Sequence, residues 1–122
     1  MTKRILVVED TDDNRQILRD LLSAVGFDLI EAVDGESGIA MAQAHKPDLI
    51  LMDIQLPLID GYEATRRIKA DPALAHIPVI AVTSYALSGD EEKTRAAGCD
   101  AYVAKPFSPR QLLSKVRELI GW

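Results

Sequence analysis

Short aliphatic runs alternate with helix-like segments along the chain, and this alternation constrains the fold more than any other feature of the sequence. Apolar runs typical of buried strands cover residues 5–8, 27–32, 49–52, 79–82 and 101–104. Apolar residues at helical spacing follow each run, roughly over residues 14–25, 36–44, 62–70, 91–97 and from 109 onward. Short connections between such pairs require parallel strands with helices on both faces of the sheet. We therefore predict an α/β fold, a doubly wound five-stranded parallel sheet that forms one domain over residues 1–122.

Local signals mark where two of these helices begin. Ser108 precedes Pro109, and Gln111 stands three residues after Ser108. Proline fits the first helical position, and a serine followed three residues later by glutamine has the pattern of a capping box. We expect the last helix to begin there. The first helix has two candidates for its capping residue, Thr11 and Asp13.

Composition and charge exclude several classes of protein. Hydrophobic residues make up 48% of the chain, which argues against disorder, while the longest apolar runs fall far short of the ~20 residues of a membrane helix. The four apolar residues 5–8 are too few for a secretory signal, so we expect a cytoplasmic protein that does not bind a membrane. The net charge of −5 argues against nucleic-acid binding. Cys99 is the single cysteine and is expected to be a small buried side chain.

Polar residues stand where the predicted strands end. Glu9 and Asp10 follow the first strand, Asp53 the third, Thr83 the fourth and Lys105 the fifth. The carboxyl ends of parallel strands lie at one edge of a doubly wound sheet, which is where such folds bind their ligands. We therefore expect three acids, one hydroxyl and one ammonium group to converge at that edge.

The charges of this expected site indicate its chemistry. Three clustered carboxylates repel one another unless a cation neutralises them, and Mg²⁺ takes carboxylates, waters and phosphate oxygens as ligands. With the Lys105 ammonium and the Thr83 hydroxyl, the set fits phosphoryl transfer, in which catalysis is mostly positioning and charge stabilisation. Asp53 ends the most buried apolar run, "DLILMD", so it is the best candidate to attack phosphorus and form an acyl phosphate.

Each of these residues also has an ordinary structural interpretation. Glu9 and Asp10 could be acids favoured near the start of a helix, and Asp53 could cap the following loop. Thr83 could simply end a strand, and Lys105 could be a surface cation. Each ordinary explanation is the commoner one for a single residue, but their joint occurrence at the strand ends favours a functional site.

The whole chain resembles the receiver domain of bacterial two-component response regulators. The resemblance is carried by the acidic pair at 9–10, the segment "DIQLPLIDG" at 53–61, the Thr83-Ser84 step and "KPF" at 105–107. The stretches "DLILMDIQLP", "HIPVIAVTSYA" and "GDEEKTRAAGCDAYVAKP" further resemble stand-alone, single-domain regulators of the cell cycle. The resemblance implies the flavodoxin-like (βα)5 receiver fold.

The same resemblance implies a role for each site residue. Asp53 would accept a phosphoryl group from a phosphohistidine on a histidine kinase or a histidine phosphotransfer protein. The side chains of Glu9, Asp10 and Asp53, with the backbone carbonyl of Gln55, would hold Mg²⁺, and Lys105 would pair with a phosphoryl oxygen. The protein would then be a signalling phosphoacceptor and not an enzyme, with self-catalysed phosphotransfer and acyl-phosphate hydrolysis only.

A conformational switch is implied as well. Thr83 would move toward the phosphoryl group, and Tyr102 would turn inward in response. A downstream protein target would bind the face formed by the helix at 91–97, the strand at 101–104 and the last helix. The chain would be a monomer or a weak dimer. It begins with a methionine and ends just after the last helix, so we expect a stand-alone regulator.

Two other classes of protein stay open at this point. Haloacid-dehalogenase-type phosphatases also form an aspartyl phosphate with Mg²⁺ on a similar sheet. They need a second aspartate two positions after the nucleophile, where this chain has Gln55, and they usually carry a cap domain. Flavin-binding domains of flavodoxin shape have a loop rich in Ser, Thr and Gly after the first strand. Residues 9–13 are acidic instead and would repel a phosphate in the absence of a metal.

Overall fold

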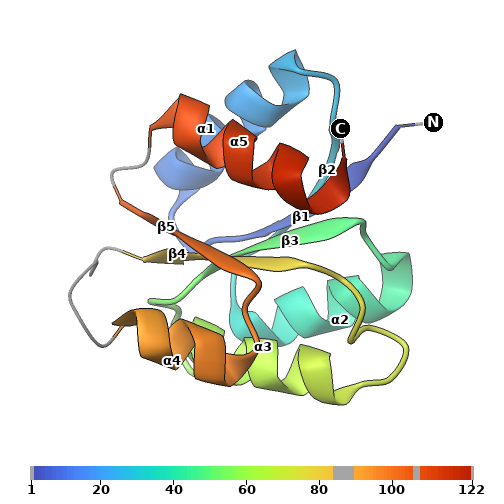
Figure 1. Cartoon of the computed structure of the whole chain (residues 1–122), viewed down its shortest axis with the longest axis vertical. Coiled ribbons are helices and arrows are strands. Elements are labelled where there is room, and N and C mark those ends of the chain that lie inside the picture. The colour runs from blue at the N-terminus through green and yellow to red at the C-terminus, as the bar shows by residue number, and fades with distance from the viewer. Residues whose placement is uncertain (1, 84–89, 106–107, 122) are drawn as a thin grey trace.

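The computed structural model describes residues 2–83, 90–105 and 108–121 as a layered α/β structure (Figure 1). The strands are β1 (Arg4–Val8), β2 (Asp28–Ala32), β3 (Leu49–Asp53), β4 (Val79–Thr83) and β5 (Ala101–Ala104). The helices are α1 (Asp12–Ala24), α2 (Gly35–His45), α3 (Gly61–Ala70), α4 (Asp90–Ala97) and α5 (Pro109–Ile120). None of the helices in this described part is long and apolar enough to span a bilayer.

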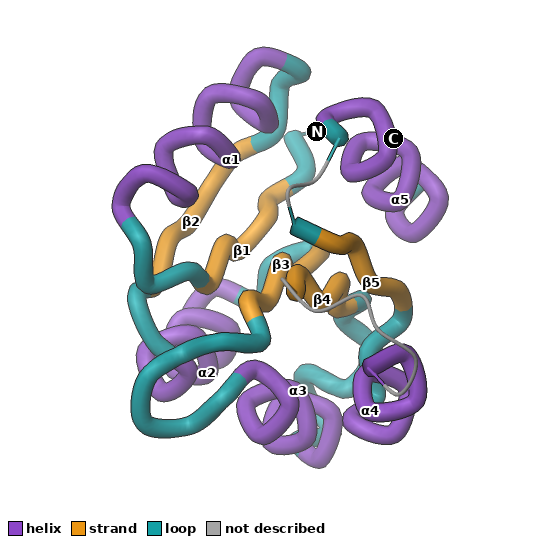
Figure 2. Tube along the Cα trace, turned by 90° about the vertical axis from the view of Figure 1, so that its left-hand side faces the viewer, coloured by secondary structure: helices purple, strands orange, loops and turns teal. Residues whose placement is uncertain are grey.

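The sheet is parallel throughout and has the strand order β2-β1-β3-β4-β5. Helices α1 and α5 cover one face, while α2, α3 and α4 cover the other (Figures 1 and 2). The chain adds β2 on one side of β1 and then crosses to place β3 on the other side, so the order reverses between β1 and β3. This arrangement confirms the predicted doubly wound sheet and puts its switch point at the carboxyl ends of these two strands.

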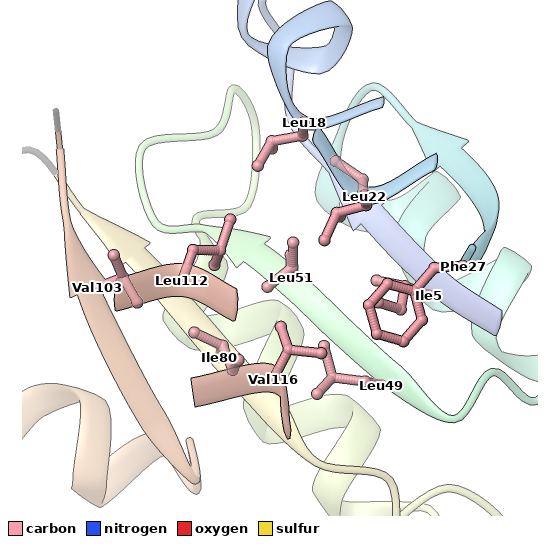
Figure 3. Close-up of a cluster of buried hydrophobic side chains, with 11 residues drawn as sticks. Ile5, Leu18, Leu22, Phe27, Leu49, Leu51, Ile80, Val103, Leu112 and Val116 are labelled. Atoms are coloured by element: carbon pink, nitrogen blue, oxygen red, sulfur yellow. The ribbon is translucent and has the colours of Figure 1, made fainter. Parts of the chain in front are cut away.

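Alternation along each inner strand divides the apolar side chains between two cores. Ile5 and Val7 of β1 point toward α1 and α5, whereas Leu6 and Val8 belong to the cluster under α2 and α3. Figure 3 shows the first cluster, in which side chains of the sheet meet those of the two helices, Leu18, Leu22, Leu112 and Val116. Because both faces of β1, β3 and β4 are covered, these strands have continuous apolar sequences.

The predicted elements are confirmed, with ends that differ by one or two residues. Helix α1 begins at Asp12, two residues earlier than expected. Asp53 and Thr83 are the last residues of β3 and β4 and do not follow them. The acid and the hydroxyl therefore belong to the rigid sheet, where Ile54 N still donates to Val82 O at 3.0 Å.

The predicted caps are wrong in their side-chain contacts. Ser108 is the N-cap of α5 with Pro109 next to it, but it makes no side-chain cap bond; its carbonyl accepts from Leu112 N instead. The expected capping box with Gln111 is therefore absent, and the fixed φ of proline is enough to start the helix. Thr11 likewise caps α1 without a side-chain bond.

The capping box that the structure does contain is on α2. Asp34 accepts a hydrogen bond from Ser37 N at 2.7 Å, and Ser37 Oγ accepts one from Asp34 N at 3.3 Å. Sequence analysis missed it because serine stands where the usual pattern has Glu or Gln.

Gly61 allows the start of α3 to approach the end of β3. A Cβ atom at this position would lie 2.3 Å from the Asp53 carbonyl oxygen and 2.7 Å from Ile54 Cα. Both neighbours are main-chain atoms, so a side chain could be accepted only by moving the backbone. The turn that carries Asp53 is therefore shaped by this glycine.

We predict that Gly61→Ala lowers the free energy of unfolding by about 2–3 kcal/mol, because the methyl group overlaps the β3 backbone. Urea unfolding measures the change. Gly121→Asn is the matched control, since that position has open space and a left-handed φ of 66° that asparagine tolerates. Equal unfolding midpoints for Gly61→Ala and the native protein would contradict the packing argument.

Candidate functional site

Three carboxylates meet at the switch point of the sheet. Glu9 and Asp10 follow β1, and Asp53 ends the neighbouring strand β3, which pairs with β1 as far as Val8 and Met52. One oxygen from each of the three lies within 4.8 Å of the others. Glu9 and Asp53 are only 2% and 3% exposed, whereas Asp10 is at the surface. The acids predicted from the strand ends are thus brought together, with one open side.

A single ammonium group lies between the two buried carboxylates. Lys105 follows β5, and its Nζ is 3.0 Å from Glu9 Oε1 and 3.3 Å from Asp53 Oδ1. The backbone N–H of Lys105 donates to the carbonyl of Thr83 at 2.7 Å, which ties the lysine to the end of β4. Burying a carboxylate costs free energy unless it is paired, and this lysine supplies the pairing for both acids.

The pKa values of two groups reflect this clustering. Burial acts to lower the pKa of Lys105, but the hydrogen bond to Glu9 and the charge of Asp53 outweigh it, and the pKa is raised overall. The ammonium therefore stays charged at neutral pH. The pKa of Asp10 is also raised, first by partial desolvation and then by the neighbouring Glu9 carboxyl. Ionised Asp10 is consequently an unfavourable third negative charge at a site without added cations.

Backbone amides hold the two buried carboxylates in place. Thr11 N donates to Glu9 Oε2 at 3.1 Å, and Gln55 N donates to Asp53 Oδ1 at 3.1 Å. The second bond means that Asp53 does organise the loop after β3, as its ordinary interpretation proposed. Gln55 N and Lys105 Nζ both contact Oδ1 of the Asp53 carboxylate, so the loop bond and the lysine contact share one oxygen.

The donor set fits a hard divalent cation. Carboxylate oxygens are the ligands that Mg²⁺ prefers, and it usually keeps several waters, which the exposed side of Asp10 would admit. Gln55 is half-buried and lies in the turn closed by Asp53. The use of its carbonyl as a ligand stays a prediction.

The remaining predicted residues lie on the side of the site toward β5. Thr83 is 1% exposed at the end of β4, and Tyr102 is half-buried in the middle of β5. Tyr102 lines two surface hollows, one toward α4 and one toward α5. Ser84, Pro106 and Phe107, which carried part of the sequence resemblance, lie outside the described residues.

Arg15 is a neighbour of the site that was not predicted from the sequence. Its Nη1 donates to the backbone carbonyl of Glu9 at 2.8 Å, and its side chain is only 12% exposed. An arginine three residues after Asp12 on a helix usually forms an ordinary surface pair, so the sequence carried no signal for a contact with the acidic loop.

Cys99 is half-buried and not fully buried as expected, and it packs beside the cluster under α2 and α3. Its Sγ is 3.8 Å from Thr65 Oγ1. Burial raises the pKa of the thiol, so it is protonated at neutral pH.

The doubly wound parallel sheet, with three carboxylates and a lysine at its switch point, defines a class of α/β domain whose site fits a divalent cation. The response regulator receiver domain family matches residues 5–117, and the chain belongs to that family. It is 46% identical over 121 residues to the polar-differentiation response regulator DivK of Brucella ovis, covering 99% of this chain and 98% of that one. The DivK protein of Brucella anthropi is 45% identical over the same extent.

Solved structures agree with this assignment. The receiver domain of a sensor histidine kinase from Pseudomonas aeruginosa superposes with a TM-score of 0.92 at 37% identity over the full length of both chains, and has a magnesium ion coordinated in its active site cleft. A putative response regulator from Chloroflexus aurantiacus superposes with a TM-score of 0.95 at 27% identity, also over both full chains. The flavodoxin-like receiver fold is therefore confirmed.

We predict that Asp10→Asn raises the free energy of unfolding at pH 7 in metal-free buffer. The pKa of Asp10 is raised in the folded state, so the folded state binds the Asp10 proton more tightly than the unfolded state does. The resulting stabilisation is present below the ordinary pKa and is lost as the pH rises through the raised value. At pH 7 the ionised carboxylate therefore lowers the free energy of unfolding, and the change to asparagine removes this loss. Because the side chain is exposed and solvent screens its charge, the gain should stay below about 1 kcal/mol.

Urea unfolding as a function of pH tests this sign. The gain should disappear below the ordinary pKa of 3.8, where Asp10 is neutral in both states. Asp13→Asn is the control, since Asp13 is an exposed acid in the first turn of α1 and its removal should give no gain. A destabilised Asp10→Asn variant at pH 7 would refute the repulsion argument.

Proposed function

We propose that this receiver domain takes a phosphoryl group on Asp53 in a Mg²⁺-dependent reaction with a histidine kinase or histidine phosphotransfer protein, and that the modification switches a protein-binding surface. The observation that carries the proposal is the Lys105 ammonium shared between the buried carboxylates of Glu9 and Asp53, with Asp10 beside them. Such a site has fixed charges for a transferring phosphoryl group and one acid placed to accept it.

The acceptor oxygen is proposed to be Asp53 Oδ2, because Oδ1 takes the contacts with Gln55 N and Lys105 Nζ. In the transfer, an Oδ2–P bond forms as the N–P bond of the phosphohistidine breaks. The departing imidazole keeps the electron pair of that bond. After the transfer, the Lys105 ammonium pairs with the phosphoryl oxygens as well as with the Glu9 carboxylate.

Magnesium would be held by the side chains of Glu9, Asp10 and Asp53 and by the carbonyl of Gln55. When bound, it would neutralise charge on the carboxylates and on the transferring phosphoryl group. The three clustered carboxylates support this assignment. The magnesium ion in the Pseudomonas receiver domain, 37% identical in sequence, gives further support.

Three large apolar side chains in α1 and in the loops after β2 and β3 are exposed, and we propose that a phosphodonor protein contacts them. Ile17 lies in the N-terminal half of α1, Val33 directly after β2, and Leu58 in the loop after β3. Their exposed fractions are 54%, 51% and 89%, high for large apolar residues.

The proposed switch uses contacts that arise only after phosphorylation. An aspartyl phosphate adds negative charge and acceptor oxygens, to which the Thr83 hydroxyl and the Lys105 ammonium can bind. Such contacts shift an existing equilibrium between two conformations and require no new fold. Tyr102 lines hollows against both α4 and α5, which supports a downstream protein binding to the α4-β5-α5 face.

Turnover as an enzyme is not part of this proposal. A dehalogenase-type phosphatase would need an aspartate at position 55, and sustained hydrolysis of a small aryl phosphate would favour that class instead. A flavin-binding role is opposed by the acidic residues after β1, and a yellow purified protein would revive it. A cytoplasmic location, a single domain over 1–122 and a monomer or weak dimer stay predictions.

We predict that Asp53→Asn abolishes phosphorylation by acetyl phosphate and Mg²⁺, because the amide has no carboxylate oxygen to attack phosphorus. Intact-protein mass spectrometry follows the added phosphoryl group. Asp48→Asn is the control, an exposed aspartate at the opposite end of β3 that should be modified like the native chain. If a phosphoryl group still appears on Asp53→Asn, Asp53 is not the residue that accepts it.

We predict that Tyr102→Ala leaves phosphorylation intact and weakens binding of the protein that the phosphorylated native chain captures, by at least about fivefold, since aromatic side chains often dominate interfaces. Titration by calorimetry measures the affinity. Gln43→Ala is the control, because Gln43 is an exposed residue of α2, which is not part of the proposed α4-β5-α5 face. Unchanged partner affinity in Tyr102→Ala would exclude β5 from the proposed interface.

A further inference from the structure

Arg15 is a nearly buried cation beside the acidic site that the proposed transfer chemistry does not use. It lies near the start of α1, and its Nη1 donates to the Glu9 carbonyl oxygen at 2.8 Å. The contact is to the main chain of the loop that carries Glu9 and Asp10. Removal of this arginine would therefore change both the charge near the site and the anchoring of the loop.

Two acids fix the guanidinium of Arg15. Asp12 pairs with its Nη2, and Glu31 Oε1 on β2 lies 3.5 Å from its Nε. Glu31 is itself held by Arg19, whose Nε and Nη2 donate to its two oxygens at 2.8 and 2.7 Å. The planar fork of arginine suits several contacts at fixed angles. Arg15 thus connects β2 and α1 to the peptide that follows β1.

The contact with the Glu9 carbonyl bears directly on Asp10. The Glu9 carbonyl and the Asp10 amide belong to one planar peptide unit, so a bond that fixes the carbonyl also fixes the direction in which the chain enters Asp10. The other polar groups of Glu9 are held by Ala32 O, Thr11 N and Lys105 Nζ. Arg15 restrains the Glu9 carbonyl, as Ala32 restrains the Glu9 N–H.

We propose that Arg15 is a positioning residue that orients the Glu9–Asp10 peptide, and with it the Asp10 carboxylate, for Mg²⁺. This inference rests on the proposed function, in which these acids hold the metal. Outer groups that orient metal ligands affect affinity without touching the ion.

The direction in which Mg²⁺ affinity changes on removal of Arg15 distinguishes a positioning role from a purely electrostatic one. A cation near three carboxylates repels Mg²⁺, so its removal should tighten Mg²⁺ binding if charge alone matters. If Arg15 orients the loop, its removal should weaken Mg²⁺ binding despite the lost repulsion.

The test compares Arg15→Met with Arg19→Met in the full chain. Each substitution removes one cation that pairs with Glu31 from α1, but only Arg15 contacts the Glu9 carbonyl. Calorimetric titration with MgCl₂ should show about tenfold weaker binding for Arg15→Met and a change within about twofold for Arg19→Met. Equal or tighter binding by Arg15→Met, or an equal loss in both variants, would overturn the inference. If Arg15→Met does not fold, Arg15→Lys replaces it, because lysine keeps the charge and lacks the planar guanidinium group. An Mg²⁺ affinity of Arg15→Lys equal to that of the native chain would overturn the inference.

A second readout needs no metal. Amide hydrogen exchange at Thr11, whose N–H donates to Glu9 Oε2, should accelerate in Arg15→Met and not in Arg19→Met, at matched thermal stability. Equal exchange in the two variants would overturn the inference. If the native chain itself binds no Mg²⁺, the proposed function fails, and this exchange experiment alone decides whether Arg15 positions the loop.

Discussion

The ion pairs of Lys105 are the interaction on which the site depends. Two carboxylates, each less than 5% exposed, lie at the ends of the adjacent strands β1 and β3, and one ammonium pairs with both. Without that cation, the end of β3 would carry an acid that its apolar surroundings could not accommodate in ionised form. Lys105 follows β5, which is separated from β3 by β4, so this pairing requires that β1, β3, β4 and β5 have assembled.

The sheet supplies what the local sequence cannot. Parallel pairing aligns the ends of β1, β3 and β4, and the apolar alternation of these strands anchors them between two helical layers. The clustered side chains thus lie at the last residue of a strand or within two residues beyond it. Side chains placed in this way take their positions from the scaffold.

Much of this arrangement could be predicted from the residue pattern. The buried strands were identifiable because aliphatic runs ended on charged or hydroxyl residues, and topology then placed Glu9, Asp10, Asp53 and Lys105 at one edge. Contacts that depend on side-chain rotamers could not be predicted. Ser108 had the right neighbours for a capping box and did not form one, while Asp34 formed one with Ser37. Arg15 had no sequence signal, because its partner is a main-chain carbonyl.

The charge count of the cluster has a consequence for ion selectivity. Three ionised carboxylates and one ammonium leave two uncompensated negative charges, which a single divalent ion cancels. A monovalent ion such as sodium would leave the cluster anionic, and a trivalent ion would overcompensate its charge. The lysine would thereby set the valence of an ion that the cluster binds, before ionic radius or coordination number discriminates among the candidates.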